Sequence, residues 1–152
     1  MKLIGLISPN LSEDTLEDVY KVFPAGIRIE GRTLKVGKYT DDEFHRAELA
    51  FADLVRDLAR SPLDFLMITG ELFLSYKGPG SDLEILDLVK TLTPTPASTV
   101  LTAVVRGCLA LGLKRIVMAS PFPEDQDERL VKFLAHYGVD VVAFRGLGCP
   151  NA

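Results

Sequence analysis

Glu71 is the residue whose type and position best suit acid–base chemistry. It follows an apolar run and precedes a glycine-punctuated loop, within the stretch DFLMITGELFLSYKGPG at 64–80. In open α/β folds, ligands bind at the carboxyl ends of strands, so this loop should border any site. A carboxylate beside apolar side chains there can serve as a catalytic base. The alternatives are a solvated loop acid or an ion-pair partner of Lys77.

Small polar residues mark the ends of other apolar runs. Ser98 and Thr99 precede a helical pattern, and the free backbone amides at a helix start bind carboxylates or phosphates. Helix capping alone also explains these two hydroxyls. The residues that we expect to bind substrate are Ser8, Asn10, Gly70, Ser98, Thr99 and Ser120.

The two cysteines lack the spacing of a metal site, and two are too few for a disulfide framework. Cys108 lies in the apolar run TAVVRGCLAL, as is typical of a small core residue. Cys149 follows GLG near the chain end, where a surface or interface thiol is favoured over a catalyst. We therefore expect no metal and a cytoplasmic location.

The overall composition describes one soluble globular unit. Of the 152 residues, 47% are hydrophobic and 25% are charged, and acids and bases are interleaved with a formal net charge of −4. Nucleic acid is not expected, because no basic face is available for a phosphate backbone. A membrane is not expected either, because no apolar run has the length of a membrane span. Small molecules and protein partners remain.

Strand and helix patterns alternate along the chain. Strands are expected at 2–8, at 27–36 with a break near Gly31, at 65–69, at 115–119 and at 139–143, with an edge strand near 93–96. Helices are expected at 12–22, 41–60, 81–92, 98–111 and 124–137. Capping boxes of Thr40 with Glu43 and of Ser81 with Glu84 should open two of them.

This alternation predicts an α/β fold in which helices cover both faces of a parallel sheet. A flavodoxin-like nucleotide or response domain shows the same alternation and is the alternative at the level of the fold. It is disfavoured, because the chain contains neither GxGxxG nor a phosphate-loop motif.

The chain also resembles itself. LKRIVMASPF at 113–122 aligns without gaps with MKLIGLISPN at 1–10, and Val131 and Gly138 match Val19 and Gly26, always 112 positions apart. We interpret this as an internal duplication, with a first α/β repeat at 1–111 and a partial second repeat at 112–152. The alternative is chance similarity between two strand–helix units of one sheet.

Several motifs together resemble the aspartate/glutamate racemase superfamily, and within it the maleate isomerase and arylmalonate decarboxylase branch. They are PN after the first strand, GIRIEGRTLKV, YKGPG, TPAST, GLKRIVMASPF and YGVDVVAFRGLG, spread over residues 2–148. The resemblance implies a three-layer parallel-sheet sandwich, here with an incomplete second repeat. It also implies two similar halves with a site between them.

The family's chemistry, by this resemblance, uses a cysteine thiolate from each half next to a substrate carboxylate, without metal or organic cofactor. Anchored on the Tyr-Lys-Gly turn at 76–78, the first family cysteine corresponds to Gly70, and Glu71 and Leu72 replace hydroxyl residues. The second cysteine would fall in a part of the repeat that this sequence does not include. A tyrosine common in the family corresponds to Phe122.

Two classes of function follow from the resemblance. The first is a cofactor-independent racemase, isomerase or decarboxylase for a small carboxylate, with Glu71 in place of a thiol or with residues supplied across a homo-oligomer interface. The second is a non-catalytic member that binds carboxylates or acts through assembly. A further alternative is that these residues are part of a longer encoded protein.

Overall fold

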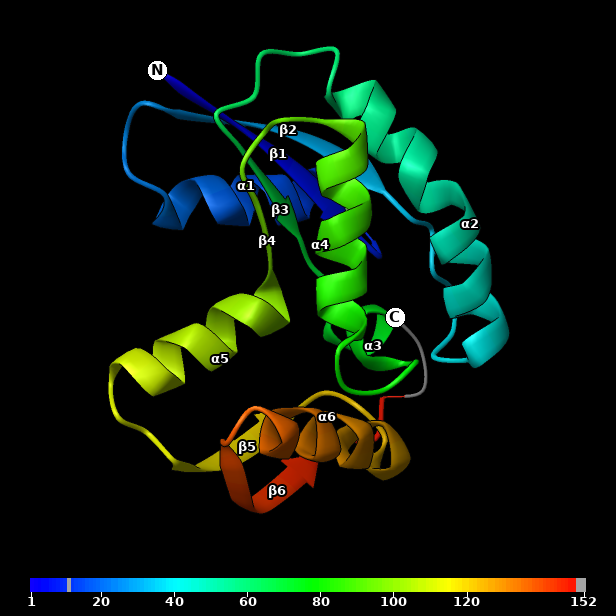
Figure 1. The fold of residues 1–152 in the computed structure, drawn as a ribbon, viewed down its shortest axis with the longest axis vertical. Helices are drawn as coiled ribbons and strands as arrows, with labels where there is room; N and C mark the ends of the chain where they lie inside the picture. Colours follow the sequence, from blue (N-terminus) through cyan, green and yellow to red (C-terminus); the bar gives the residue numbers. More distant parts are fainter. Residues whose placement is uncertain (11, 150–152) are drawn as a thin grey trace.

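The computed structural model describes residues 1–10 and 12–149, in which two separate parallel sheets are formed. The first sheet has the order β2-β1-β3-β4 and the second pairs β5 with β6 (Figure 1). The strands are β1 (Lys2–Ser8), β2 (Ile27–Thr33), β3 (Phe65–Ile68), β4 (Ala97–Thr99), β5 (Arg115–Ser120) and β6 (Asp140–Gly146). The helices are α1 (Glu13–Val22), α2 (Asp41–Leu58), α3 (Glu71–Ser75), α4 (Ser81–Leu92), α5 (Val100–Ala110) and α6 (Glu124–His136). The predicted α/β fold with parallel strands is confirmed.

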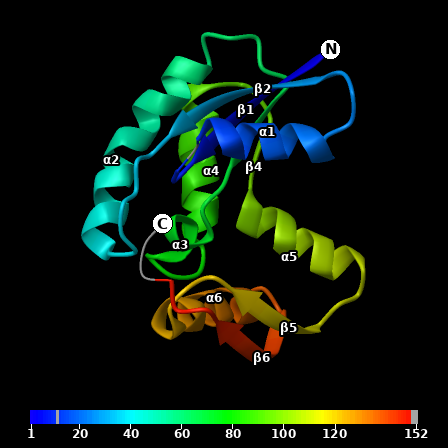
Figure 2. The ribbon, with the colours of Figure 1, turned by 180° about the vertical axis from the view of Figure 1, so that it is seen from behind.

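Helices cover both faces of the first sheet, which makes a three-layer sandwich (Figures 1 and 2). On one face, Ile7, Leu66 and Ile68 are fully buried against α2 and α4. The predicted apolar stripe of α2 faces this core, with Phe44, Ala47, Phe51, Val55 and Leu58 buried and Leu54 partly buried. Helix α1 covers the opposite face, where Val19 and Phe23 line a cavity over Ile4, Leu6 and Met67.

Four local predictions were wrong. The edge strand expected near 93–96 lies at Ala97–Thr99, directly after Pro94 and Pro96. The strand near Gly31 is not broken, because β2 runs continuously beside β1 from Ile27 to Thr33. The loop after β3 contains a short helix, α3, that begins at Glu71. The expected capping box at the start of α4 is absent, because Gly80 is the N-cap and the Ser81 hydroxyl donates to the Leu74 and Gly78 carbonyls.

The two sheets repeat the same pairing. Ile4 lies opposite Ile29 between β1 and β2, and Ile116 lies opposite Val141 between β5 and β6, so both partners are shifted by 112 positions. A bulge after Ile116 then changes the register of the second pair. This register supports the proposed division into repeats at 1–111 and 112–152, of which residues 150–152 lie outside the described residues.

Several contacts join the second sheet and α6 to the first repeat. Helix α3 packs against α6, and the Arg129 guanidinium is 2.6 Å from an Asp41 carboxylate oxygen at the start of α2. The Tyr137 hydroxyl, just after α6, donates to the buried Asp82 carboxylate at 2.8 Å. Because of these contacts, the loop after β5 lies against the carboxyl ends of β1 and β3.

Candidate active site

A cavity of about 260 Å³ lies at the carboxyl ends of β1 and β3. This is the edge of a parallel sheet at which α/β proteins bind ligands. Its lining brings together four of the predicted site residues, which are Ser8, Asn10, Gly70 and Glu71. The other lining residues are Pro9, Val36, Tyr39, Phe44, Thr69, Leu72, Phe73 and Phe122.

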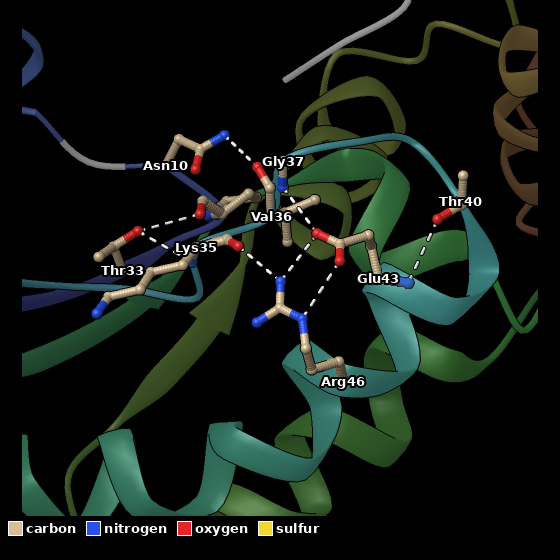
Figure 3. A network of polar contacts seen from close by, with 9 residues as sticks. Asn10, Thr33, Lys35, Val36, Gly37, Thr40, Glu43 and Arg46 are labelled. Atoms are coloured by element: carbon tan, nitrogen blue, oxygen red, sulfur yellow. Dashed lines mark hydrogen bonds and ion pairs between the residues drawn. The ribbon is translucent and has the colours of Figure 1, made fainter.

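Hydrogen bonds between the loop after β1 and the loop after β2 build one wall of this cavity (Figure 3). The Asn10 side-chain amide donates to the Val36 carbonyl at 2.6 Å, and the Thr33 hydroxyl donates to the Pro9 carbonyl at 3.1 Å. Lys35 adopts the left-handed conformation with φ of 57°. This turn directs the chain so that Val36 is buried against the site while Lys35 stays exposed.

An ion pair on α2 anchors the same wall (Figure 3). Glu43 accepts from the Gly37 amide and from Arg46, each at 2.9 Å, and Arg46 also donates to the Lys35 carbonyl at 2.7 Å. The Arg46 guanidinium and the Gly37 amide lower the pKa of Glu43. Thr40 caps α2 by accepting from the Glu43 amide, but Glu43 does not return the bond, so the predicted capping box is half formed.

Gly70 is required by the geometry at the end of β3. Its φ of 99° lies in the left-handed region, which side chains disfavour. A Cβ there would lie 2.7 Å from Pro9 Cδ and closer still to Pro9 Cγ. The family cysteine that the resemblance places at this position therefore cannot be accommodated unless the Pro9 ring moves.

Glu71 begins α3. Its side chain lines both this cavity and a neighbouring cavity of about 490 Å³. It is not the partner of Lys77, because the Lys77 ammonium contacts Glu48 on α2. Among the described residues, the Glu71 carboxylate has no side-chain ion pair or hydrogen bond. This leaves its oxygens available to a ligand.

Aromatic side chains are four of the eight other lining residues. Tyr39 and Phe122 meet edge to face with ring centroids 5.5 Å apart, so the second repeat closes the cavity. Burial raises the pKa of Tyr39, and the nearby charges of Cys149 and Glu71 add to this effect. The lining contains no Lys, Arg or His, so a bound anion would be held by neutral donors.

The other predicted site residues lie elsewhere. Thr99 is fully buried, and its hydroxyl accepts from the Thr102 amide at 3.0 Å as the N-cap of α5. The neighbouring Ser98 hydroxyl donates to the Thr99 carbonyl, and neither residue lines the cavity. Ser120 lines the second cavity with Glu71, and its hydroxyl donates to the buried Asp127 carboxylate at 2.6 Å.

Tyr39 and Thr69 are the polar lining residues that sequence reasoning missed. Thr69 ends the predicted third strand, so the rule that ligands bind at strand ends could have included it. Tyr39 gave no comparable signal, because its position depends on the loop that Arg46 and Glu43 hold in place.

Residues 1–10 and 12–149 offer neither a membrane span nor a metal-binding cluster. No helix in this part of the chain combines the length and apolar character needed to cross a membrane. Nor does it contain a group of three or more His, Cys, Asp or Glu side chains placed to hold a metal ion.

The chain has the α/β fold of the Asp/Glu racemase-like proteins. The maleate cis-trans isomerase of Nocardia farcinica, solved with a covalently bound succinylcysteine intermediate, superposes with a TM-score of 0.89 at 16% identity, covering 99% of this chain and 65% of that one. A double variant of arylmalonate decarboxylase in a liganded form superposes with a TM-score of 0.82 at 23% identity. The superposition covers 99% of this chain and 64% of that one. At these identities the likeness establishes the fold.

Sequence comparison gives the family. The sequence profile described as arylmalonate decarboxylase matches residues 4–151, and the chain belongs to this family. The arylmalonate decarboxylase of Bordetella bronchiseptica is 26% identical over 145 residues, which are 95% of this chain and 60% of that protein. The chain thus spans less than two thirds of the length of these relatives.

Proposed function

We propose that the cavity at the ends of β1 and β3 binds a small carboxylate and that Glu71 exchanges a proton with the adjacent carbon. The chain would then act as a cofactor-independent racemase, isomerase or decarboxylase. The observation that carries this proposal is one cavity of about 260 Å³ that combines Ser8, Asn10, Gly70 and Glu71. Membership of the arylmalonate decarboxylase family supports it.

Neutral donors are available for the substrate carboxylate. Asn10 uses one amide hydrogen on the Val36 carbonyl and has a second to offer. The Ser8 hydroxyl makes a long bond of 3.2 Å to the Asn10 carbonyl and can rotate toward a ligand. These groups orient the carboxylate, while Glu71 stands at the end of the neighbouring strand.

Racemisation and decarboxylation each require a proton transfer that Glu71 can perform. In racemisation, ionised Glu71 takes the proton from the carbon next to the carboxylate, water on the opposite face gives a proton to the resulting carbanion and so inverts it, and the Glu71 proton returns to the hydroxide left in the solvent. In decarboxylation, the bond to a carboxylate breaks, CO₂ leaves, and protonated Glu71 supplies a proton to the resulting carbanion. General acid–base catalysis of this kind contributes about 10²–10⁴-fold to a rate.

The walls favour a substrate with an apolar substituent. Tyr39, Phe44, Phe73 and Phe122 line the cavity together with its polar residues, and aromatic side chains suit an aryl group. Maleate, which the Pseudomonas putida isomerase binds, would leave these faces without a partner. We therefore place an arylmalonate ahead of maleate or an amino acid.

Proton NMR in D₂O tests this function with phenylmalonate, maleate, aspartate, glutamate and a hydantoin. We expect CO₂ loss or exchange at the adjacent carbon, with phenylmalonate the best substrate, and a loss of about 100-fold or more in Glu71→Gln. The matched control is Glu17→Gln on α1, which removes an exposed carboxylate outside the site. Turnover that persists in Glu71→Gln would refute the role of Glu71.

A second candidate is a non-catalytic member that binds carboxylates. It is favoured by the close packing of Gly70 on Pro9, which leaves no room for a thiol, and by the absence of cysteine from the lining. Binding of phenylmalonate without turnover by folded protein would select this candidate.

A further inference from the structure

The loop after β5 forms the part of the cavity wall that comes from the second repeat. Phe122 in this loop lines the cavity, and its ring meets the Tyr39 ring edge to face. Tyr39 belongs to the loop before α2, so these two side chains join walls from different repeats. The shape of the cavity on this side therefore depends on how the turn at 120–122 is held.

Ser120 makes the side-chain hydrogen bonds that set this turn. Its hydroxyl accepts from the Phe122 amide at 3.0 Å and donates to the carboxylate of Asp127, in the first turn of α6, at 2.6 Å. Backbone amides of 147–149 donate to the carbonyls of 120–122 at 2.9–3.1 Å. The turn is thus fixed from two sides, by α6 and by the segment after β6.

Asp127 is placed where it does not favour stability. It is fully buried, and Ser120 donates to its Oδ1 atom. Among the described residues, its Oδ2 atom has no hydrogen-bond partner. A buried carboxylate with an unsatisfied oxygen lowers the stability of a fold, so stability alone does not explain an aspartate at this position.

Gly146, the last residue of β6, lets Asp127 reach the turn. A Cβ on Gly146 would lie 2.5 Å from Asp127 Oδ2 and closer still to the Phe122 carbonyl oxygen. Both oxygens therefore pack around the same bare Cα atom. This packing fixes the carboxylate relative to the backbone of the residue that lines the cavity.

We propose that Asp127 is a positioning residue of the candidate active site and that, through Ser120, it holds Phe122 against the aryl group of the substrate. This inference rests on the proposed function, because it assigns the wall that receives the aryl group in the same cavity. Asp127 acts through its hydrogen bond, since its side chain does not line the cavity. An asparagine can replace it, because its amide oxygen can accept from Ser120 and its amide nitrogen can donate to the Phe122 carbonyl.

Calorimetric titration with phenylmalonate and malonate tests this role, because malonate has both carboxylates but no aryl group. In Ser120→Ala and Asp127→Ala we expect about tenfold weaker binding of phenylmalonate and a change of less than about twofold for malonate. Asp127→Asn should keep the affinity of the unmodified chain for both ligands. The matched control is Thr93→Val, because the Thr93 hydroxyl accepts from the Thr95 amide at 3.2 Å in the same way, outside the cavity.

Amide exchange in the ligand-free chain gives a readout that needs no substrate. The Phe122 amide should exchange about tenfold faster in Ser120→Ala and Asp127→Ala than in the unmodified chain and Asp127→Asn, with circular dichroism unchanged. Equal weakening of both ligands, an Asp127→Asn variant as weak as Asp127→Ala, or unchanged Phe122 exchange in Ser120→Ala would each overturn the positioning role. An unmodified chain that binds no phenylmalonate would instead refute the proposed function, and the exchange rates would then decide whether Asp127 holds the turn.

Discussion

At the scale of single residues, Glu71 and its proposed ligand carry charges of the same sign. Two unit charges 4 Å apart repel by about 1 kcal/mol in water and about 4 kcal/mol near a protein surface. The lining has no cationic side chain to offset this repulsion. Replacing the Glu71 carboxylate by a neutral amide would remove this repulsion.

Glu71→Gln removes the repelling charge, so phenylmalonate should bind about fivefold more tightly to this variant than to the unmodified chain. Isothermal titration calorimetry at one pH measures both affinities. A weaker affinity in Glu71→Gln would contradict this account of the repulsion.

Gly70 should be intolerant of any side chain. Gly70→Ala combines a left-handed backbone with overlap on the Pro9 ring, and we expect a loss of about 2–4 kcal/mol in the free energy of unfolding. Gly78→Ala is the matched control, because φ there is 97° and no atom lies within 4 Å of the added Cβ. Equal losses in urea denaturation would show that the Pro9 contact is unimportant.

At the scale of elements, α3 is held to α2 through one carboxylate. Glu48 accepts from the Tyr76 hydroxyl at 2.5 Å and contacts the Lys77 ammonium. Burial opposes ionisation of Glu48, but these two partners outweigh it and lower its pKa. Helix α3 is only five residues long, so its position, and that of Glu71, depends on such tertiary contacts.

Glu48→Gln should lower stability by about 1 kcal/mol at neutral pH. The folded-state pKa lies below the ordinary 4.5, so the stability from Glu48 is present above pH 4.5 and is lost as pH falls through the folded pKa. The difference in melting temperature between the unmodified chain and Glu48→Gln should accordingly shrink as the pH falls below about 4.5. A difference that persists at pH 3 would contradict this account.

Sequence patterns predicted the elements that local chemistry determines. The stripe and Thr40 cap of α2 are local features, and both were found. Helix α3 was missed because ELFLS is too short for a helical period and is stabilised by Glu48 and α6. The cap of α4 was misassigned because the left-handed Gly80, rather than Ser81, ends the loop.

At the scale of the whole molecule, a buried carboxylate fastens the second repeat to the first. Asp82 of α4 is 1% exposed and accepts from Tyr137 at 2.8 Å and from Thr102 of α5 at 2.6 Å. Self-similarity of the sequence predicts a duplication, and β1–β2 and β5–β6 begin in the same register. It did not predict this contact, because position 25, the counterpart of Tyr137, is an alanine.

Tyr137→Phe should cost about 1–3 kcal/mol, since Asp82 stays buried with one donor fewer. Burial and the bond to Asp82 raise the pKa of Tyr137 from 10 to about 12. The stability that the Tyr137 hydroxyl contributes is therefore present below pH 10 and is lost as the pH rises toward 12. Tyr20→Phe, which removes a hydroxyl that bonds to the Ile29 backbone at an exposed position, is the control in chemical denaturation and should cost less, because no buried charge loses a donor. Equal losses would contradict a special role for the buried contact.

The most direct test of the central claim is an amide NMR titration of the chain with phenylmalonate. The account predicts saturable shifts at Asn10, Gly70 and Glu71, which line the cavity at the ends of β1 and β3. Shifts confined to the apolar cavity beneath α1, around Ile4 and Phe23, or no shifts at millimolar ligand, would contradict it.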